Sequence, residues 1–130
     1  MRRKRQEGQA MVEFALVLPI LILLVCGIID FGWIFGNQII ANNAVREAAR
    51  YTAIHYEDYA GDDGAAGTKA LSIIQAKAQN LEGPTLQGSL KTGEDITINV
   101  KGTIPVLTPF TSLFLTDEYT MTAKSVMRIE

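Results

Sequence analysis

Residue types that commonly build chemical sites are scarce in this sequence of 130 residues. It has one cysteine, Cys26, which excludes an intrachain disulfide, and one histidine, His55. No cysteine or second histidine lies near His55 to complete a transition-metal site. The chain also has no serine–histidine–aspartate or cysteine–histidine arrangement and no glycine loop suited to phosphate. We therefore expect no enzyme, no metal site and no cofactor.

Positive charge is scarce outside the first eight residues. Residues 1–8, which we call the leader, hold four basic residues and Glu7 and therefore carry a charge of +3. Because the formal net charge of the chain is −2, residues 9–130 carry a charge of −5. The acidic body has no basic, aromatic-interleaved face of the kind that binds phosphates, so nucleic acid is not an expected partner. The basic leader residues are Arg2, Arg3, Lys4 and Arg5.

Charge is absent from a long apolar run near the N-terminus. Residues 14–29 are uncharged, and Asp30 is the only charged residue between Phe14 and Val45. A helix needs about 20 mostly apolar residues to cross a bilayer, so residues 14–35 predict one membrane-spanning helix. Basic residues beside a span stay in the cytoplasm. For a span in the cytoplasmic (inner) membrane, this rule places the N-terminus on the cytoplasmic side and the C-terminus on the outer side.

A cleaved secretory signal is the alternative for this run. Its apolar core would have only about 7–15 residues and would end at a small-residue cleavage site, which this sequence lacks. Helical sequence instead continues past Asp30, whose carboxylate we expect to reach the outer interface by snorkelling or local hydration. Trp33 lies where that interface belongs.

Proline and glycine each predict a local feature of the run. Pro19 frees a backbone carbonyl that neighbours in a membrane can satisfy, so we expect a kinked helix rather than a broken one. Gly32 and Gly36 form a small-xxx-small pair on one face, which favours close contact with another helix. The alternative is that glycine is simply common in membrane helices.

The predicted helix extends well beyond the membrane. The stretch "NQIIANNAVREAARYTA" has no proline or glycine and places Ile40, Ala44, Ala48 and Tyr51 at helical spacing. One helix over residues 9–53 would be roughly 65–70 Å long, far more than a bilayer requires.

The start of this helix carries a recognisable pattern. A basic leader, Gly8, then "QAMV" and Glu13-Phe14 opening the apolar run resemble the processing site of type IV pilin-like precursors. The string from Gly8 to about Ala53 resembles the TadE-like minor pilins, or pseudopilins, of tight-adherence (Flp-type) pilus systems. The Glu-Phe pair favours this branch, because the major Flp pilins more often have Glu-Tyr.

The resemblance implies a processed assembly protein. A prepilin peptidase would cut after Gly8, leaving Gln9 as the new N-terminus, Glu13 as the fifth residue and Phe14 as the aromatic that follows it. The implied partners are that peptidase, other pilin or pseudopilin subunits and the pilus assembly platform. The implied location is the inner membrane, followed by the extracellular pilus if the subunit enters the filament.

Each of these features also has a simpler explanation. Basic residues precede any helix with its N-terminus inside, and Glu13 alone could be a snorkelling carboxylate. The alternative function is therefore an uncleaved single-pass envelope protein whose outer domain binds a partner. Gly8 and Glu13 five residues apart, directly before an uncharged run, favour the pilin interpretation.

The remaining sequence predicts a small water-facing domain. Its linker is acidic and glycine-rich, and its carboxylates lack the ligand spacing of a calcium loop, so we expect a solvated loop rather than a cation site. The expected layout is a leader at 1–8, the long helix at 9–53, a linker at 54–67 and an extracytoplasmic domain at 68–130. The acidic residues of the linker are Glu57, Asp58, Asp62 and Asp63.

A short helix and two strands are predicted within that domain. Thr68 is a suitable helix cap and Gly83-Pro84 a suitable stop. The apolar face of this helix would hold Leu71, Ile74, Ala78 and Leu81. Residues 95–101 and 118–130 alternate apolar and polar side chains as half-buried strands do, and residues 85–91 could pair with the first as a hairpin.

The expected fold is therefore α+β and pilin-like: a long N-terminal, partly transmembrane α-helix followed by a small antiparallel β-sheet with one short helix. Residues 102–118 are too apolar for an ordinary loop. They either cover the small core, which we favour, or form a contact surface for another subunit.

Overall fold

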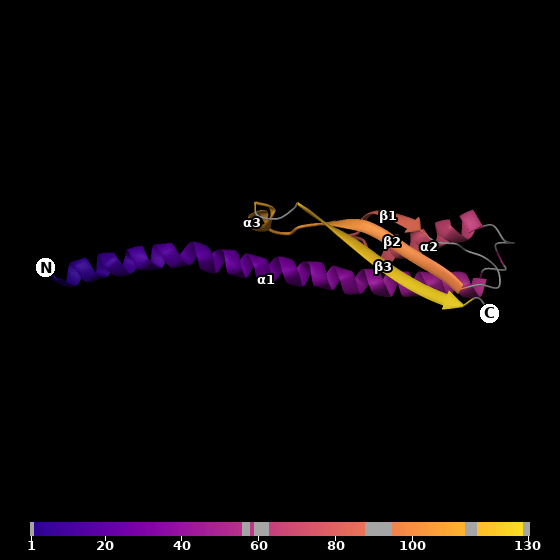
Figure 1. Ribbon diagram of the computed structural model, residues 1–130, viewed down its shortest axis with the longest axis horizontal. Coiled ribbons are helices and arrows are strands. Elements are labelled where there is room, and N and C mark those ends of the chain that lie inside the picture. The colour runs from indigo at the N-terminus through magenta and orange to yellow at the C-terminus, as the bar shows by residue number, and fades with distance from the viewer. Residues whose placement is uncertain (1, 56–57, 59–62, 88–94, 114–116, 129–130) are drawn as a thin grey trace. The chain divides into compact units, whose positions relative to one another are not determined.

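Three helices and three strands make up the described part of the protein, a computed structural model covering residues 2–55, 58, 63–87, 95–113 and 117–128 (Figure 1). In chain order they are α1 (Arg2–His55), α2 (Asp63–Lys77), β1 (Glu82–Gln87), β2 (Asp95–Pro105), α3 (Pro109–Ser112) and β3 (Glu118–Arg128).

The chain divides into two units, which we call the helix unit and the sheet unit. The helix unit comprises Met1–Trp33 and Val106–Asp117, and the sheet unit comprises Ile34–Pro105 and Glu118–Glu130. The expected α+β, pilin-like class is confirmed, with a long apolar helix, a second helix and an antiparallel sheet.

The sheet has the order β1-β2-β3 and is antiparallel throughout. Strands β2 and β3 pair without interruption from Asp95 opposite Arg128 to Pro105 opposite Glu118. The predicted alternation is confirmed in both strands, because buried side chains recur at every second position and the buried positions of β2 pair with those of β3. The buried inward side chains are Ile98, Val100, Ile104, Met121, Ala123 and Ser125. Tyr119 belongs to the apolar positions of this alternation but is 46% exposed, because it lies near the start of an edge strand.

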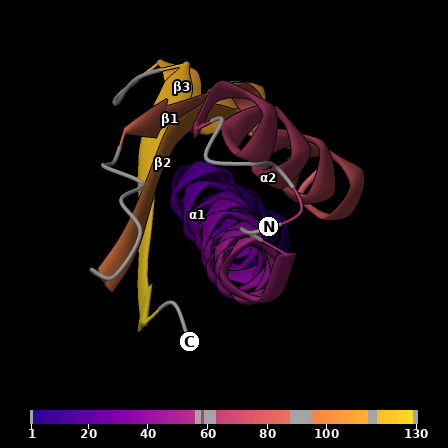
Figure 2. The same cartoon turned by 90° about the vertical axis from the view of Figure 1, so that its right-hand side faces the viewer.

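Within the sheet unit, the last part of α1 lies along one face of the sheet, with α2 beside it (Figure 2). Small side chains form its buried stripe, which lets the helix approach the sheet closely. Ala44 and Ala48 are fully buried as expected, whereas Ile40 is 44% exposed because the stripe runs one position away from it. The stripe consists of Asn37, Ala41, Ala44, Val45, Ala48, Ala49 and Thr52.

Helix α2 starts and stops earlier than expected. It begins at Asp63, so the predicted linker at 54–67 is too long at both ends, α1 itself continuing to His55. The glycine-rich composition misled the prediction, because Ala66, Gly67 and Ala70 are buried on one face and this packing offsets glycine's entropic cost. The Thr68 hydroxyl donates to Gly64 O (2.9 Å) inside the helix and is not a cap.

The predicted stop at Gly83-Pro84 is also wrong. Helix α2 ends at Lys77, and a turn closed by Leu81 N–H donating to Ala78 O (3.0 Å) leads into β1. Pro84 lies in this edge strand, where the register shifts between Glu82 and Thr85 and a missing N–H costs no ladder bond. The expected pairing of residues 85–91 is confirmed for 85–87, and residues 88–91 lie outside the described part.

Residues 102–118 do not form one cover over the core. Ile104 ends the buried row of β2, while Val106–Asp117 belong to the helix unit. Leu107 and Leu113 there are 55% and 76% exposed, so these leucines do not cover a core as we expected.

Candidate processing and assembly segment

The N-terminal part of α1 is a bare helix within the helix unit. Every side chain from Lys4 to Val25 is exposed, including all of the apolar ones. Within the described residues, one helix is long and apolar enough to cross a membrane, and its most apolar window is unburied. Such a surface is stable only when lipid or other apolar helices cover it.

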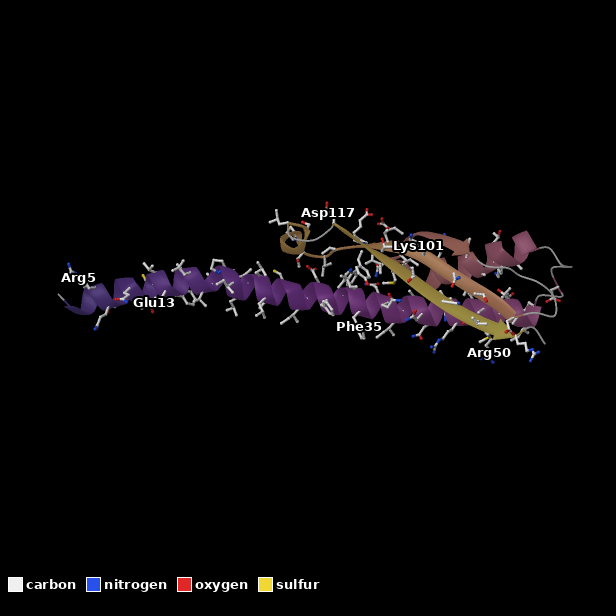
Figure 3. All side chains as sticks on the ribbon, in the orientation of Figure 1. Arg5, Glu13, Phe35, Arg50, Lys101 and Asp117 are labelled. Carbon is white, nitrogen blue, oxygen red and sulfur yellow. The ribbon has the colours of Figure 1, made fainter. Side chains whose placement is uncertain are left out.

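Two of the predicted processing and assembly residues are in contact. The Gln9 side-chain amide Nε2 donates a hydrogen bond to Glu13 Oε1 (3.2 Å), one helical turn away. Glu13 lies on the exposed N-terminal part of α1 (Figure 3). Gly8 precedes them inside α1, and a Cβ built on it meets no described atom within 4 Å. The segment around the expected cut is therefore helical and sterically open.

The other predicted assembly residues are dispersed along the helix. Phe14 is 64% exposed and Pro19 is exposed within an uninterrupted helix, and the expected kink stays a prediction. An ideal Cβ on Gly32 or Gly36 meets no atom within 4 Å, so the described residues do not pack closely against either glycine.

The leader has no separate structure. Its residues from Arg2 onward continue α1, and the Lys4 and Arg5 side chains are exposed. The Arg2 and Arg3 side chains lie outside the described part. Because α1 runs through Gly8 without a break, the fold gives no boundary between the leader and the rest of the helix.

Asp30 is the feature that sequence reasoning missed. We expected a carboxylate reaching for water, but Asp30 is only 2% exposed. Its Oδ1 accepts the Thr108 N–H (2.9 Å) and its Oδ2 accepts the Thr108 hydroxyl. Thr108 precedes Pro109, the first residue of α3, which is a common way to start a helix. In the sequence, this Thr-Pro pair and the lone acid in an apolar run were the two features that pointed to such a contact.

His55, the single histidine of the sequence, packs against Tyr51 of the same helix. It is half-buried, its Nδ1 lies 3.0 Å from Tyr51 O, and its ring stacks on that of Tyr51 with centroids 4.2 Å apart. Lys69 Nζ lies 5.9 Å from the Tyr51 ring centroid, a cation–π distance. This cluster joins α1 to α2.

The candidate cation site of the acidic loop stays untested. Asp58 is exposed, whereas Glu57 and Asp62 lie outside the described part. Where the structure is described, no three histidine, cysteine, aspartate or glutamate side chains gather in a way that could hold a metal.

The sequence of the N-terminal helix is similar to that of a known protein family. Residues 8–50 match the family described as TadE-like protein. This part of α1 is therefore similar to the N-terminal segment of TadE-like proteins. This match begins at Gly8, the residue expected before the cut, and leaves α2 and the sheet unmatched. Family members are pilus-associated and generally not enzymes. No curated protein and no solved structure matches the chain.

Proposed function

We propose that this TadE-like chain is a minor pilin or pseudopilin required to assemble a Tad (Flp-type) pilus. The observation that carries the proposal is the bare apolar surface of α1 in the matched segment, where the uncharged run starts directly after Glu13. In the membrane lipid covers this surface, and in a pilus the helices of neighbouring subunits replace that lipid. The proposed partners are other pilin subunits and the assembly platform.

The proposed topology follows from charge. The leader stays in the cytoplasm, residues 14–35 span the inner membrane, and residues 68–130 form the extracytoplasmic domain. On assembly the subunit would leave the membrane, and four cationic side chains would then have to enter an apolar helix bundle. Charge in such surroundings is costly unless it is paired, so removal of the leader favours assembly.

The proposed processing step is cleavage after Gly8 by a prepilin peptidase. Glycine lowers helix stability by roughly 0.5–1 kcal/mol relative to alanine, so the α1 backbone opens more easily at Gly8 than at the residues directly beside it. The cut would free the α-amine of Gln9, about one turn from Glu13. In the uncut chain the neutral Gln9 amide already donates to that carboxylate. The new ammonium would be a stronger, charge-assisted donor, to Glu13 of the same subunit or of a neighbour.

The intact mass of the membrane-bound protein tests this function. The chain would be expressed with its cognate prepilin peptidase and, as a matched control, with a catalytically inactive peptidase. We expect loss of residues 1–8 only with the active enzyme. A chain that keeps its leader in both strains contradicts the proposal and favours the uncleaved envelope protein.

A further inference from the structure

The segment Val106–Leu113 of the helix unit has no part in the proposed function. Two hydrogen bonds from Thr108 hold it on the buried Asp30 carboxylate of α1. The two ends of this loop are joined by a hydrogen bond, in which Val106 N–H donates to Asp117 O (3.1 Å). The segment is thus a tethered turn whose position along α1 is fixed by Asp30.

The depth of Asp30 follows from helix geometry. Asp30 lies sixteen residues after Phe14, or about 24 Å along α1, and the hydrocarbon layer is about 30 Å thick. When residues 14–35 span the bilayer, Asp30 and Thr108 lie just inside its outer boundary. A carboxylate at that depth needs partners, and the Thr108 N–H and hydroxyl supply them.

The surface of the tethered turn is apolar. Leu107 is 55% exposed and Leu113 is 76% exposed. No charged residue occurs in residues 106–116, and the exposed Asp117 follows directly. An apolar tip that ends at an acid suits a boundary between hydrocarbon and water. A wholly aqueous turn would gain nothing from two exposed leucines.

We propose that Val106–Leu113 is a second membrane contact, which inserts Leu107 and Leu113 into the outer leaflet beside the spanning helix. The partner is lipid, because the Asp30 tether holds the leucines at the depth where the spanning surface of α1 already meets lipid. Unlike the cut after Gly8, this contact requires only the membrane insertion part of the proposed function. It would hold the outer end of the helix at the interface before assembly.

Site-specific fluorescence in vesicles tests the contact. The full chain with Cys26→Ser would carry one new cysteine labelled with an environment-sensitive nitrobenzoxadiazole dye. Leu113→Cys is the test position, and Ile22→Cys is the lipid reference. Ser72→Cys, on the exposed face of α2, is the water reference. The vesicles contain phosphatidylethanolamine and phosphatidylglycerol, with doxyl-labelled lipid as the membrane quencher and iodide as the aqueous one.

We expect the dye at residue 113 to be quenched by the doxyl lipid and protected from iodide, as at residue 22. The same result is expected in nanodiscs that hold one chain each. Iodide quenching like that at residue 72 overturns the proposal. Protection that disappears at one chain per disc also overturns it, because the occupant is then a second copy of the chain.

Variants of Asp30 test the tether separately from insertion of the helix into the membrane. Asp30→Ala should lower doxyl quenching at residue 113 several-fold while residue 22 is unaffected, and Asp30→Asn, which keeps an acceptor oxygen, should retain much of it. Equal quenching in Asp30→Ala overturns the tether. Loss of doxyl quenching at residue 22 in the parent chain contradicts membrane insertion, and with it the proposed function. No peptidase is present, so processing does not affect either readout.

Discussion

Gly102 of β2 lies so close to Leu81 that a Cβ on the glycine would be 2.7 Å from Leu81 Cγ and Cδ1. It would also lie 3.0 Å from the backbone oxygen of Glu82. Leu81 is buried directly before β1, next to the register shift between Glu82 and Thr85. The absence of a side chain at Gly102 therefore allows the turn after α2 to enter the sheet.

Gly102→Ala should destabilise the protein by about 1–3 kcal/mol, the usual cost of overpacking a core. The clash involves the branch point of Leu81 and a backbone oxygen, so rotation of a side-chain end cannot relieve it. Chemical denaturation of the full chain in detergent micelles, followed by far-UV circular dichroism, measures the change.

Gly36→Ala is the matched control. A Cβ on Gly36 meets no described atom within 4 Å, and the residue is in the interior of α1. The helix should gain roughly 0.5–1 kcal/mol from reduced backbone entropy in the unfolded chain. Equal effects of the two alanines would contradict the close approach at Gly102.

Ala48→Leu should also destabilise the sheet unit, by about 1–3 kcal/mol. Ala48 is fully buried in the small-residue stripe of α1, and a larger side chain would push the helix off the sheet. The control is Asn43→Leu, on the exposed side of the same helix, which should change stability by less than about 0.5 kcal/mol. The same denaturation measurement applies, and a neutral Ala48→Leu would show that this face is not packed.

Lys77→Ala should have little effect, although Lys77 forms an ion pair with Glu47 between α2 and α1. Both side chains are about half exposed (48% and 52%), and such pairs contribute roughly 0.2–1 kcal/mol. The loss should shrink further at high salt, because screening weakens the pair in the parent chain. A salt-independent loss of several kcal/mol would mean that Lys77 acts through packing instead.

The sequence predicted the elements with strong periodicity and missed those set by tertiary contact. Alternation located β2 and β3, and the uncharged run located α1. The start of α2 was missed because glycine content argues for a loop, whereas the burial of Ala66, Gly67 and Ala70 decides the matter. Propensity is a weak guide when packing opposes it.

The candidate site divides in the same way. Gly8, Glu13 and Phe14 are proposed from local order along the chain, and the match over residues 8–50 agrees with the family that they suggest. The bond between Asp30 and Thr108 joins residues 78 positions apart, a separation that no local pattern encodes. A lone acid in an apolar helix predicts only that some partner exists.

Gly8→Ala should block processing, with the leader retained on the membrane-bound chain. A Cβ at this position meets no described atom, so the fold should tolerate it, and a block would reflect recognition by the peptidase. Intact mass measures retention, and circular dichroism checks that the helix content is unchanged. Lys4→Ala, exposed within the same leader, is the control and should leave cleavage largely intact. Normal cleavage of Gly8→Ala would contradict the assigned site.

Glu13→Ala should leave cleavage largely intact but impair incorporation into pili. Glu13 is exposed and accepts only a 3.2 Å bond from a neutral amide in the uncut chain, so its loss should cost the monomer little. After the cut, the Gln9 ammonium would lose the carboxylate that offsets its charge inside the helix bundle. Glu13→Gln distinguishes charge from hydrogen bonding, because its amide oxygen still accepts a bond but cannot neutralise the ammonium. Immunoblots of sheared pili and of membranes measure the ratio of pilus-bound to membrane-bound subunit, and this ratio should fall for both variants. Incorporation that survives Glu13→Gln would show that hydrogen bonding suffices, and normal incorporation of Glu13→Ala would remove the proposed role of this acid.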